Sequence, residues 1–167
     1  SVERIKKERG QSLGEVILRN LNEVTCFLPG ICNNGCEDCE SYFKQMIHCS
    51  NFTGNNLCIN DYMVLFDNLD ACGVNKVNIV INSLFENTGL NSIIDKLTEC
   101  SFKKEFYLSI NNLNDNVRKL FIPDSTVNIS FHLSSSNKSK IEQTISLYRK
   151  YSIDWNCIVA DELDIEL

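Results

Sequence analysis

The sequence predicts an α/β fold: a parallel sheet of about five strands with helical cover. Short runs rich in Val, Ile and Phe alternate with segments whose apolar residues recur at helical spacing. The runs read as apolar on both faces, which is typical of parallel strands covered by helices. With 167 residues, 43% of them hydrophobic, the chain is long enough for one core. A doubly wound sheet and part of a βα barrel both fit, and both bind ligands at the carboxyl ends of the strands.

The chain divides into three predicted parts. Residues 1–22 are expected to form an N-terminal helical segment, because Ser12 to Glu15 has the form of a capping box. Residues 23–160 are expected to form one βα domain, and residues 161–167 an acidic tail that is solvated or without fixed structure. The last predicted strand would be an exposed edge, which is a liability in native sheets. We therefore expect a fragment of a longer protein, or a domain completed by a partner.

Strands and helices alternate through the predicted domain. The first strand is Glu23–Leu28, which Pro29 and Gly30 end. Asn60 or Asp61 is predicted to cap a helix that reaches Cys72, and Gly73 is expected to close it in the left-handed conformation. The other predicted strands are residues 74–81, 106–110, 127–133 and 153–160, and the other predicted helices are residues 40–48, 90–97, 115–121 and 137–151.

Composition excludes several function classes. Net charge is −6, from 16 basic and 22 acidic residues, and no basic stripe is present, so we do not expect nucleic-acid binding. No apolar run approaches the roughly 20 residues of a membrane span, and no signal peptide is visible. Nine cysteines, an odd number at uneven spacing, do not suit a secreted disulfide scaffold. We expect a reducing cytoplasm, with some cysteines as ligands and others as small buried residues.

Three cysteines directly after the first strand carry the strongest chemical signal. Cys32, Cys36 and Cys39 form a Cys-x3-Cys-x2-Cys run, and Gly35 eases its tight backbone. Thiolates at these spacings can surround one cubic iron–sulfur cluster and leave one iron without a protein ligand. Two alternatives remain: a zinc site with Cys26 or His48 as fourth ligand, and free thiols. Core packing is the better reading of Cys26.

The surrounding residues resemble the radical S-adenosylmethionine (SAM) superfamily. The resemblance rests on Cys32-Asn33-Asn34-Gly35-Cys36-Glu37-Asp38-Cys39, which matches the first loop of that family. It extends over about residues 20–160. Further matches are Gly73-Val74 before the second strand, Ser109-Ile110-Asn111-Asn112 after the third, and Asn128–His132 in the fourth.

The resemblance implies an incomplete (β/α)6 barrel of the radical SAM type. A [4Fe–4S] cluster would be bound by Cys32, Cys36 and Cys39, and SAM would chelate the open iron. Reductive cleavage of SAM would give a 5′-deoxyadenosyl radical that abstracts a hydrogen atom. The residues expected to contact SAM are Asp38, Asn82, Ser83, Asn111 and Ser130. His132, at the end of a strand, is a further residue that can point into the site.

The chain departs from the family pattern at three points. The position before the third cysteine is usually aromatic, and here it is Asp38, which leaves only backbone contact with adenine. The Gly-Gly-Glu-Pro motif after the second strand is replaced by Asn82-Ser83-Leu84-Phe85-Glu86-Asn87. Asn82 or Ser83 would supply polar atoms there, or Glu86 in a slipped register. Only five strands are predicted, where the family has about six.

The expected function is therefore a radical SAM enzyme that modifies a peptide or protein, of the maturase type. Its expected partners are a peptide or protein substrate, an electron donor and the remainder of its own chain. One alternative is a degenerate, non-catalytic radical SAM-like binding module, and another is a small zinc-binding domain. Cys49 and Cys58 flank a polar loop, and we interpret them as free thiols without a shared role. A disulfide between them or a metal site is the alternative. Cys72, Cys100 and Cys157 are read as core or helix-end residues.

Overall fold

Five parallel strands form the framework of the protein. The structure is a computed structural model, in which residues 21–28, 58–81 and 88–158 are described. Neighbouring strands pair in parallel throughout. The strands are β1 (Glu23–Phe27), β2 (Lys76–Val80), β3 (Lys103–Ser109), β4 (Ser125–His132) and β5 (Ile153–Ile158).

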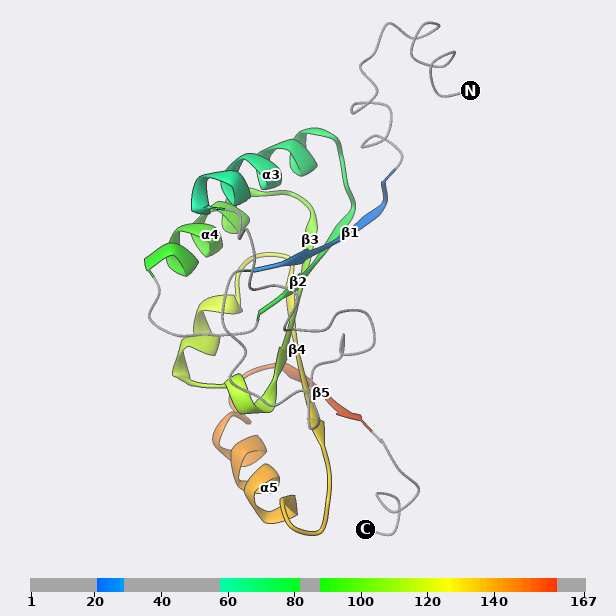
Figure 1. Ribbon diagram of the computed structural model, residues 1–167, viewed down its shortest axis with the longest axis vertical. Coiled ribbons are helices and arrows are strands. Elements are labelled where there is room, and N and C mark those ends of the chain that lie inside the picture. Colours follow the sequence, from blue (N-terminus) through cyan, green and yellow to red (C-terminus); the bar gives the residue numbers. More distant parts are fainter. Residues whose placement is uncertain (1–20, 29–57, 82–87, 159–167) are drawn as a thin grey trace, which may run out of the picture.

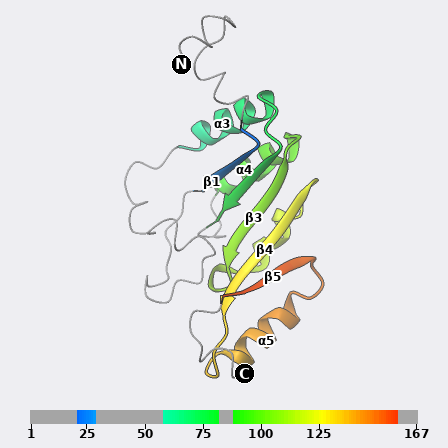
Figure 2. The ribbon, with the colours of Figure 1, turned by 90° about the vertical axis from the view of Figure 1, so that its right-hand side faces the viewer.

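The order of the strands is β1-β2-β3-β4-β5, so each strand lies beside its neighbours in the sequence. A doubly wound sheet has a point where the strand order reverses. The described strands contain no such point, so the described part of the sheet is singly wound. The helices α3 (Ile59–Ala71), α4 (Thr88–Glu99) and α5 (Lys138–Leu147) lie on the same side of the sheet, as Figures 1 and 2 show. The predicted parallel α/β fold is confirmed.

The helix α3 begins slightly earlier than predicted. Cys58 is its N-cap residue, and the Asp61 carboxylate accepts a hydrogen bond of 2.8 Å from the Cys58 backbone N–H. Hydrogen bonds from the Cys58 side chain and from the Cys58 backbone N–H lower the pKa of Asp61. At the other end, Gly73 has φ +73°, so the predicted left-handed cap is confirmed.

The core lies between the sheet and the helices. It is built from side chains that alternate along each strand, such as Val77 and Ile79 of β2, and from the inner faces of the helices. Phe66 and Leu69 of α3 are almost completely buried, as the helical spacing predicted. Cys26 and Cys100 are buried in this core, so the core reading of both is confirmed. Burial raises the pKa of the Cys26 thiol to about 11.

One charged side chain lies inside this core. Lys104 of β3 has no exposed surface, and its ammonium donates hydrogen bonds to the carbonyl oxygens of Cys100 and Pro123, at 2.5 and 3.2 Å. Its Nζ also lies 5.6 Å from the ring centre of Phe102. Because Cys100 directly follows α4, the ammonium compensates the negative end of that helix. Lys104 thus joins α4 to the segment that enters β4.

The opposite side of the sheet is polar, and the prediction of strands that are apolar on both faces was wrong. In β3, Lys103, Glu105, Tyr107 and Ser109 alternate with residues that enter the core. The register aligns most of them with polar residues of the neighbouring strands, although Tyr107 pairs with Val80. We call this side the polar face. Its polar residues are Glu23, Thr25, Lys76, Asn78, Lys103, Glu105, Tyr107, Ser109, Thr126, Asn128, Ser130 and His132, and the apolar Phe27 and Val80 lie on the same side.

Several boundaries near the C-terminal half differ from the prediction. The predicted helix 115–121 is the 3-10 helix η4 (Asp115–Leu120), and a second one, η3 (Ile110–Asn112), follows β3 directly. The helix α5 ends at Leu147, four residues earlier than predicted, and Leu147 is 74% exposed rather than part of the core. Cys157 is exposed, which corrects its assignment as a core or helix-end residue.

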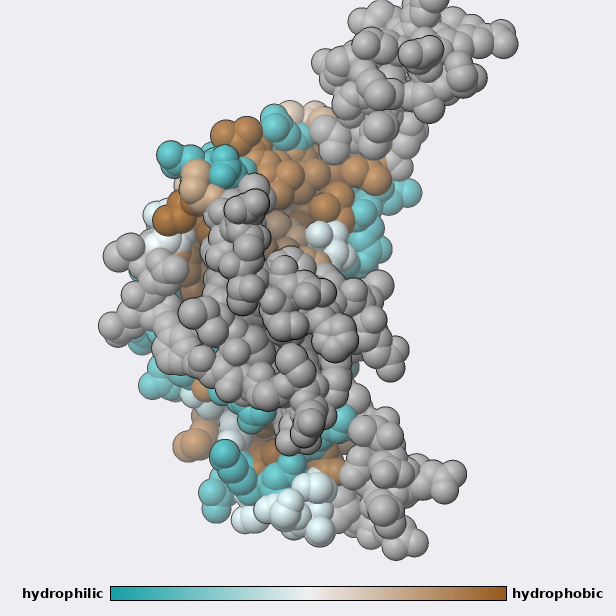
Figure 3. Space-filling view, viewed as in Figure 1, coloured by the Kyte–Doolittle hydropathy of each residue, from teal (hydrophilic) through white to brown (hydrophobic). Residues whose placement is uncertain are grey.

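The outer surface of α3 carries apolar side chains. Figure 3 shows hydrophobic residues gathered over this end of the molecule, and Ile59 and Val64 of α3 are 39% and 59% exposed.

Within the described residues, no helix is both long enough and apolar enough to span a membrane. Residues 1–20 of the predicted N-terminal helical segment, the predicted helix 40–48 and the tail 161–167 lie outside the described residues, while residues 21 and 22 are not helical.

Candidate functional site

The carboxyl edge of the sheet is where the sequence places its chemistry. The backbone N–H of Leu28 donates to the Val80 carbonyl, and that of Ile81 donates to the Tyr107 carbonyl. The strands β1 and β2 therefore both end at this edge. Leu28 and Ile81 follow the ends of these two adjacent strands. In an open parallel α/β sheet, this edge is where ligands bind.

Most of the predicted site residues follow those two strand ends in the sequence. The predicted metal ligands Cys32, Cys36 and Cys39 lie outside the described residues. The same is true of Asp38, Asn82 and Ser83, and of the alternative residues Glu86, His48 and Cys49. These assignments remain predictions.

Ser130, a predicted SAM contact, lies on the polar face at the carboxyl end of β4. It is 3% exposed and pairs in register with Ser109 of β3, which is 4% exposed. The Ser130 hydroxyl donates to the Leu108 carbonyl at a long 3.5 Å, and the Ser109 hydroxyl accepts the Asn111 backbone N–H at 3.2 Å. Two small hydroxyl side chains therefore stand side by side on adjacent strands.

Ser109, which pairs with Ser130, was not among the predicted site residues. The signal was available in the alternation Lys103, Glu105, Tyr107, Ser109, which has the period of a strand with one polar face. His132 is the next residue after Ser130 on the same face of β4, and it is partly exposed. His132 thus lies on the polar face, and its role in the site remains a prediction. Its carbonyl accepts a hydrogen bond of 2.9 Å from the Asn137 side chain.

Asn111, the other described SAM contact of the prediction, lies apart from Ser130. It belongs to η3 and is exposed, and its side chain lines a groove on the helix side of the sheet. The structure therefore brings Ser109 and Ser130 together on the polar face, whereas Asn111 lies on the far side of η3. The Ser109 hydroxyl, which caps η3, connects the two locations.

A charged network occupies the amino end of the polar face. The Lys76 ammonium lies 2.9 Å from a Glu23 oxygen and 3.7 Å from a Glu105 oxygen, and Lys103 lies 2.7 Å from Glu105. The Tyr107 hydroxyl donates to Glu105 at 2.8 Å. Burial alone would raise the pKa of Glu105, but the hydrogen bonds from Lys103 and Tyr107 outweigh it and lower that pKa. The hydrogen bond with Glu23 raises the pKa of Lys76.

Asn78 stands in the middle of this network. Its amide nitrogen donates to Glu23 at 2.5 Å, and the residue is 6% exposed. Its Oδ1 atom is buried and has no hydrogen-bond donor within the described ranges. A buried amide oxygen of this kind is usually paired with protein or ordered water. Its partner is therefore to be sought among groups outside the described residues, such as water or a ligand.

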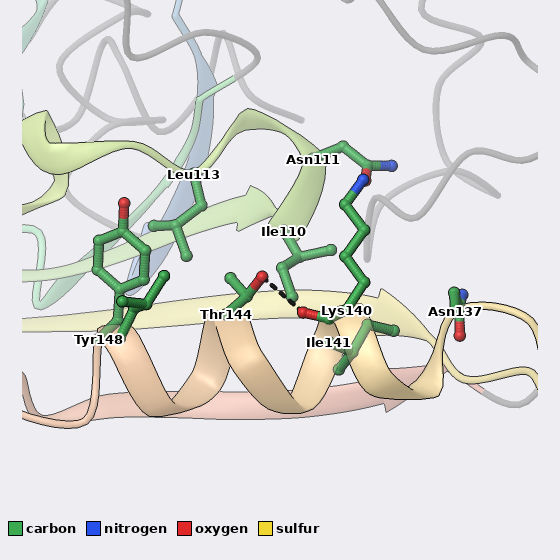
Figure 4. Close-up of a pocket in the computed structure, with 9 residues that line it drawn as sticks. Ile110, Asn111, Leu113, Asn137, Lys140, Ile141, Thr144 and Tyr148 are labelled. Atoms are coloured by element: carbon green, nitrogen blue, oxygen red, sulfur yellow. Dashed lines mark hydrogen bonds between the residues drawn. The ribbon is translucent and has the colours of Figure 1, made fainter.

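A groove with a volume of about 470 Å³ lies between η3 and α5 (Figure 4). Its apolar lining comes from Ile110, Leu113, Ile141 and Leu147. Asn111, Asn137, Lys140, Thr144 and Tyr148 supply the polar lining. In Figure 4 the Lys140 side chain extends from α5 towards Asn111. The sequence prediction missed this groove because it forms only when two distant elements meet.

The described cysteines differ in how far they are buried. Cys26 is buried on the helix side of β1, where its raised pKa disfavours a thiolate ligand. Cys58 and Cys157 are exposed free thiols. No group of three or more potential metal-binding side chains is present among the residues that the structure describes.

The described residues can be compared with the needs of a cluster and SAM. The donor set Cys32, Cys36 and Cys39 has the thiolate chemistry that an iron–sulfur cluster requires. In the sequence, this donor set follows β1, whose carboxyl end lies next to that of β2. The polar face offers buried hydroxyl groups at the same edge, in Ser109 and Ser130. These features fit a cluster with a polar cofactor beside it.

The described residues define the class of the protein as a singly wound parallel α/β protein with polar groups at the carboxyl edge of its sheet. Comparison of the chain with protein-family models, with curated proteins and with solved structures found no match.

Proposed function

We propose that this chain is a radical SAM domain, an incomplete (β/α)6 barrel that modifies a peptide or protein. One observation carries the proposal: in the sequence, the Cys-x3-Cys-x2-Cys segment follows β1, which ends at the carboxyl edge of a singly wound parallel sheet. The strand order is the one that a βα barrel has, and the polar face corresponds to the inside of such a barrel. A polar interior suits a charged cofactor better than a packed apolar one.

The roles of the chain's own residues follow from their places. Cys32, Cys36 and Cys39 would hold a [4Fe–4S] cluster, which supplies the electron that cleaves SAM to methionine and a 5′-deoxyadenosyl radical. Ser130 and Ser109 would orient the ribose or methionine part of SAM by hydrogen bonds from the end of β4 and β3. The charged network from Glu23 to Glu105 closes the amino end of the polar face and fixes its shape.

Reconstitution of the full chain with iron and sulfide under anaerobic conditions tests the cluster. We expect a brown protein with broad visible absorbance and, after reduction, the electron paramagnetic resonance signal of a [4Fe–4S]⁺ cluster. The variants C32A, C36A and C39A should each lose most of the bound iron. Cys157→Ala is the matched control, because Cys157 is an exposed free thiol on β5, and it should load normally. Normal loading of C32A would disprove the ligand assignment.

Cleavage of SAM tests the activity. With a strong reductant, the reconstituted protein should form 5′-deoxyadenosine, measured by chromatography and mass spectrometry. Ser130→Ala should weaken SAM binding by roughly tenfold, which is the loss of one hydrogen bond to a ligand. Ser152→Ala, at an exposed position before β5, should leave binding unchanged. A loaded cluster without any SAM cleavage would instead favour the non-catalytic binding module.

A further inference from the structure

The groove between η3 and α5 lies next to the proposed site but is separate from it. Its wall η3 is capped by the Ser109 hydroxyl, and Ser109 belongs to the polar face. Asn111, two residues later, lines the groove on the helix side. A molecule in this groove would therefore contact η3, which directly follows the carboxyl end of β3.

The charge of the groove is opposite to that of the protein. The chain has a net charge of −6, yet among the described residues that line the groove Lys140 is the charged one, and none of them is Asp or Glu. Asp115 lies at the other end of the groove, where its carboxylate accepts a long hydrogen bond of 3.5 Å from the Tyr148 hydroxyl. The end of the groove near Lys140 and Asn111 is thus the cationic one.

The first turn of α5 reinforces this charge. It carries Lys138 and Lys140 and no acidic residue. Cations near the N-terminus of a helix oppose the helix dipole and lower the stability of the helix. The Asn137 side chain does not cap α5 either, since it bonds to Ser134 and His132 instead. The lysines therefore do not stabilise the helix, and Lys140, the one of the two that lines the groove, is placed to pair with an anion there.

We propose that this groove binds an extended peptide segment in which carboxylate side chains alternate with apolar ones. A carboxylate would pair with Lys140, and apolar side chains would pack on Ile110, Leu113 and Ile141. The Asn111 amide, beside the end of Lys140 in Figure 4, would bond to the peptide backbone. The inference rests on the proposed function and names its substrate class: an acidic, partly apolar peptide.

Peptide binding to the full chain tests this inference without a cluster or SAM. The probe is a dansyl-labelled peptide of alternating Glu and Leu, followed by fluorescence anisotropy, with the Lys and Leu peptide as comparison. Binding of the acidic peptide should be clearly stronger, and Lys140→Glu should weaken it at least about tenfold. Lys140→Arg, which keeps the positive charge, should bind the acidic peptide as the parent chain does. Lys150→Glu changes the net charge equally but lies over Tyr151 outside the groove, so it should have little effect.

Three results would overturn the proposal. Equal binding of both peptides would remove the role of charge, and equal loss in K140E and K150E would indicate a general field rather than this groove. Formation of a dimer that K140E abolishes would assign the groove to a second copy of the chain. Because Lys140 is exposed, the variants should unfold at the same temperature as the parent chain. Peptide binding without SAM cleavage would refute the proposed function and leave the groove assignment intact.

Discussion

Lys104 shows how a single residue can decide the arrangement of two elements. A buried ammonium costs free energy unless its hydrogen bonds are satisfied. In this protein the carbonyl oxygens of Cys100 and Pro123 satisfy it, and the Phe102 ring lies beside it. The long side chain also fills core volume that no other described side chain fills.

Substitution of Lys104 separates its packing from its hydrogen bonds. Lys104→Ala should lower the free energy of unfolding by about 3 kcal/mol, because it leaves a cavity and two carbonyl groups without donors. Lys104→Met keeps most of the volume and should lose only about half as much. Urea unfolding followed by circular dichroism measures both. An alanine variant as stable as the parent would show that Lys104 is not buried as described.

At the scale of elements, the polar face depends on the ionisation of its carboxylates. The pKa values of Glu23 and Glu105 are lowered in the fold, from an ordinary value of 4.5. Such groups stabilise the fold above their unfolded pKa, and this contribution is lost as the pH falls through the folded pKa. The network should therefore loosen in acid, below about pH 4.5.

Glu105→Gln tests this dependence. The variant should lose about 1 to 2 kcal/mol at neutral pH, because it weakens the bonds from Lys103 and Tyr107. The difference from the parent chain should shrink as the pH falls below about 4.5. Glu142→Gln, at an exposed position of α5, is the control and should show neither effect. A constant difference from pH 7 to pH 3 would contradict the assignment.

The end of α3 gives a second prediction at this scale. Gly73 has φ +73°, and an added Cβ would meet no atom within 4 Å, so only backbone strain opposes a side chain there. Gly73→Ala should therefore cost about 1 kcal/mol, and Gly73→Asn roughly half of that, because Asn tolerates the left-handed conformation better. Thermal unfolding compares the two variants. Equal stability of alanine and glycine at this position would mean that the turn adopts another conformation.

At the scale of the whole molecule, the strands differ in their partners. β3 is hydrogen-bonded to β2 and β4, whereas β1 and β5 are the outer strands of the described sheet. Amides of a central strand exchange only by large openings, and those of an outer strand by local ones. Their exchange rates therefore report how the sheet ends.

Hydrogen exchange measured by mass spectrometry tests this difference. Peptides that cover residues 103–109 should exchange roughly a hundredfold more slowly than those that cover residues 153–158. A peptide from α4 serves as the internal reference for helical protection. If β5 is as protected as β3, another strand pairs with its outer edge, and the sheet is larger than the five strands described.

The pattern of the sequence was sufficient for the parallel α/β fold and for most strands and helices. Apolar periodicity correctly placed Phe66 and Leu69 in the core, because the residues on the inner face of a helix recur every three to four positions. It placed the start of β3 at Phe106 instead of Lys103, since Lys103 and Glu105 face away from the core and do not look like strand residues. The cap of α3 was missed because Cys is not a common N-cap residue.

The site was only partly predictable for a related reason. Ser130 was named from a local resemblance, whereas its pairing with Ser109 depends on the register of two strands. The groove between η3 and α5 depends on how segments about 30 residues apart pack together, which no local pattern contains. Residues whose role comes from long-range packing need the three-dimensional structure.

The consecutive order of the strands also bears on how the chain reaches its native state. Each strand pairs with the one made just before it, so the sheet can grow during synthesis without waiting for distant segments. A ribosome-bound chain that ends after β3 would already contain every pairing that β1 and β2 use. The nascent protein can therefore fold one βα unit at a time as it leaves the ribosome.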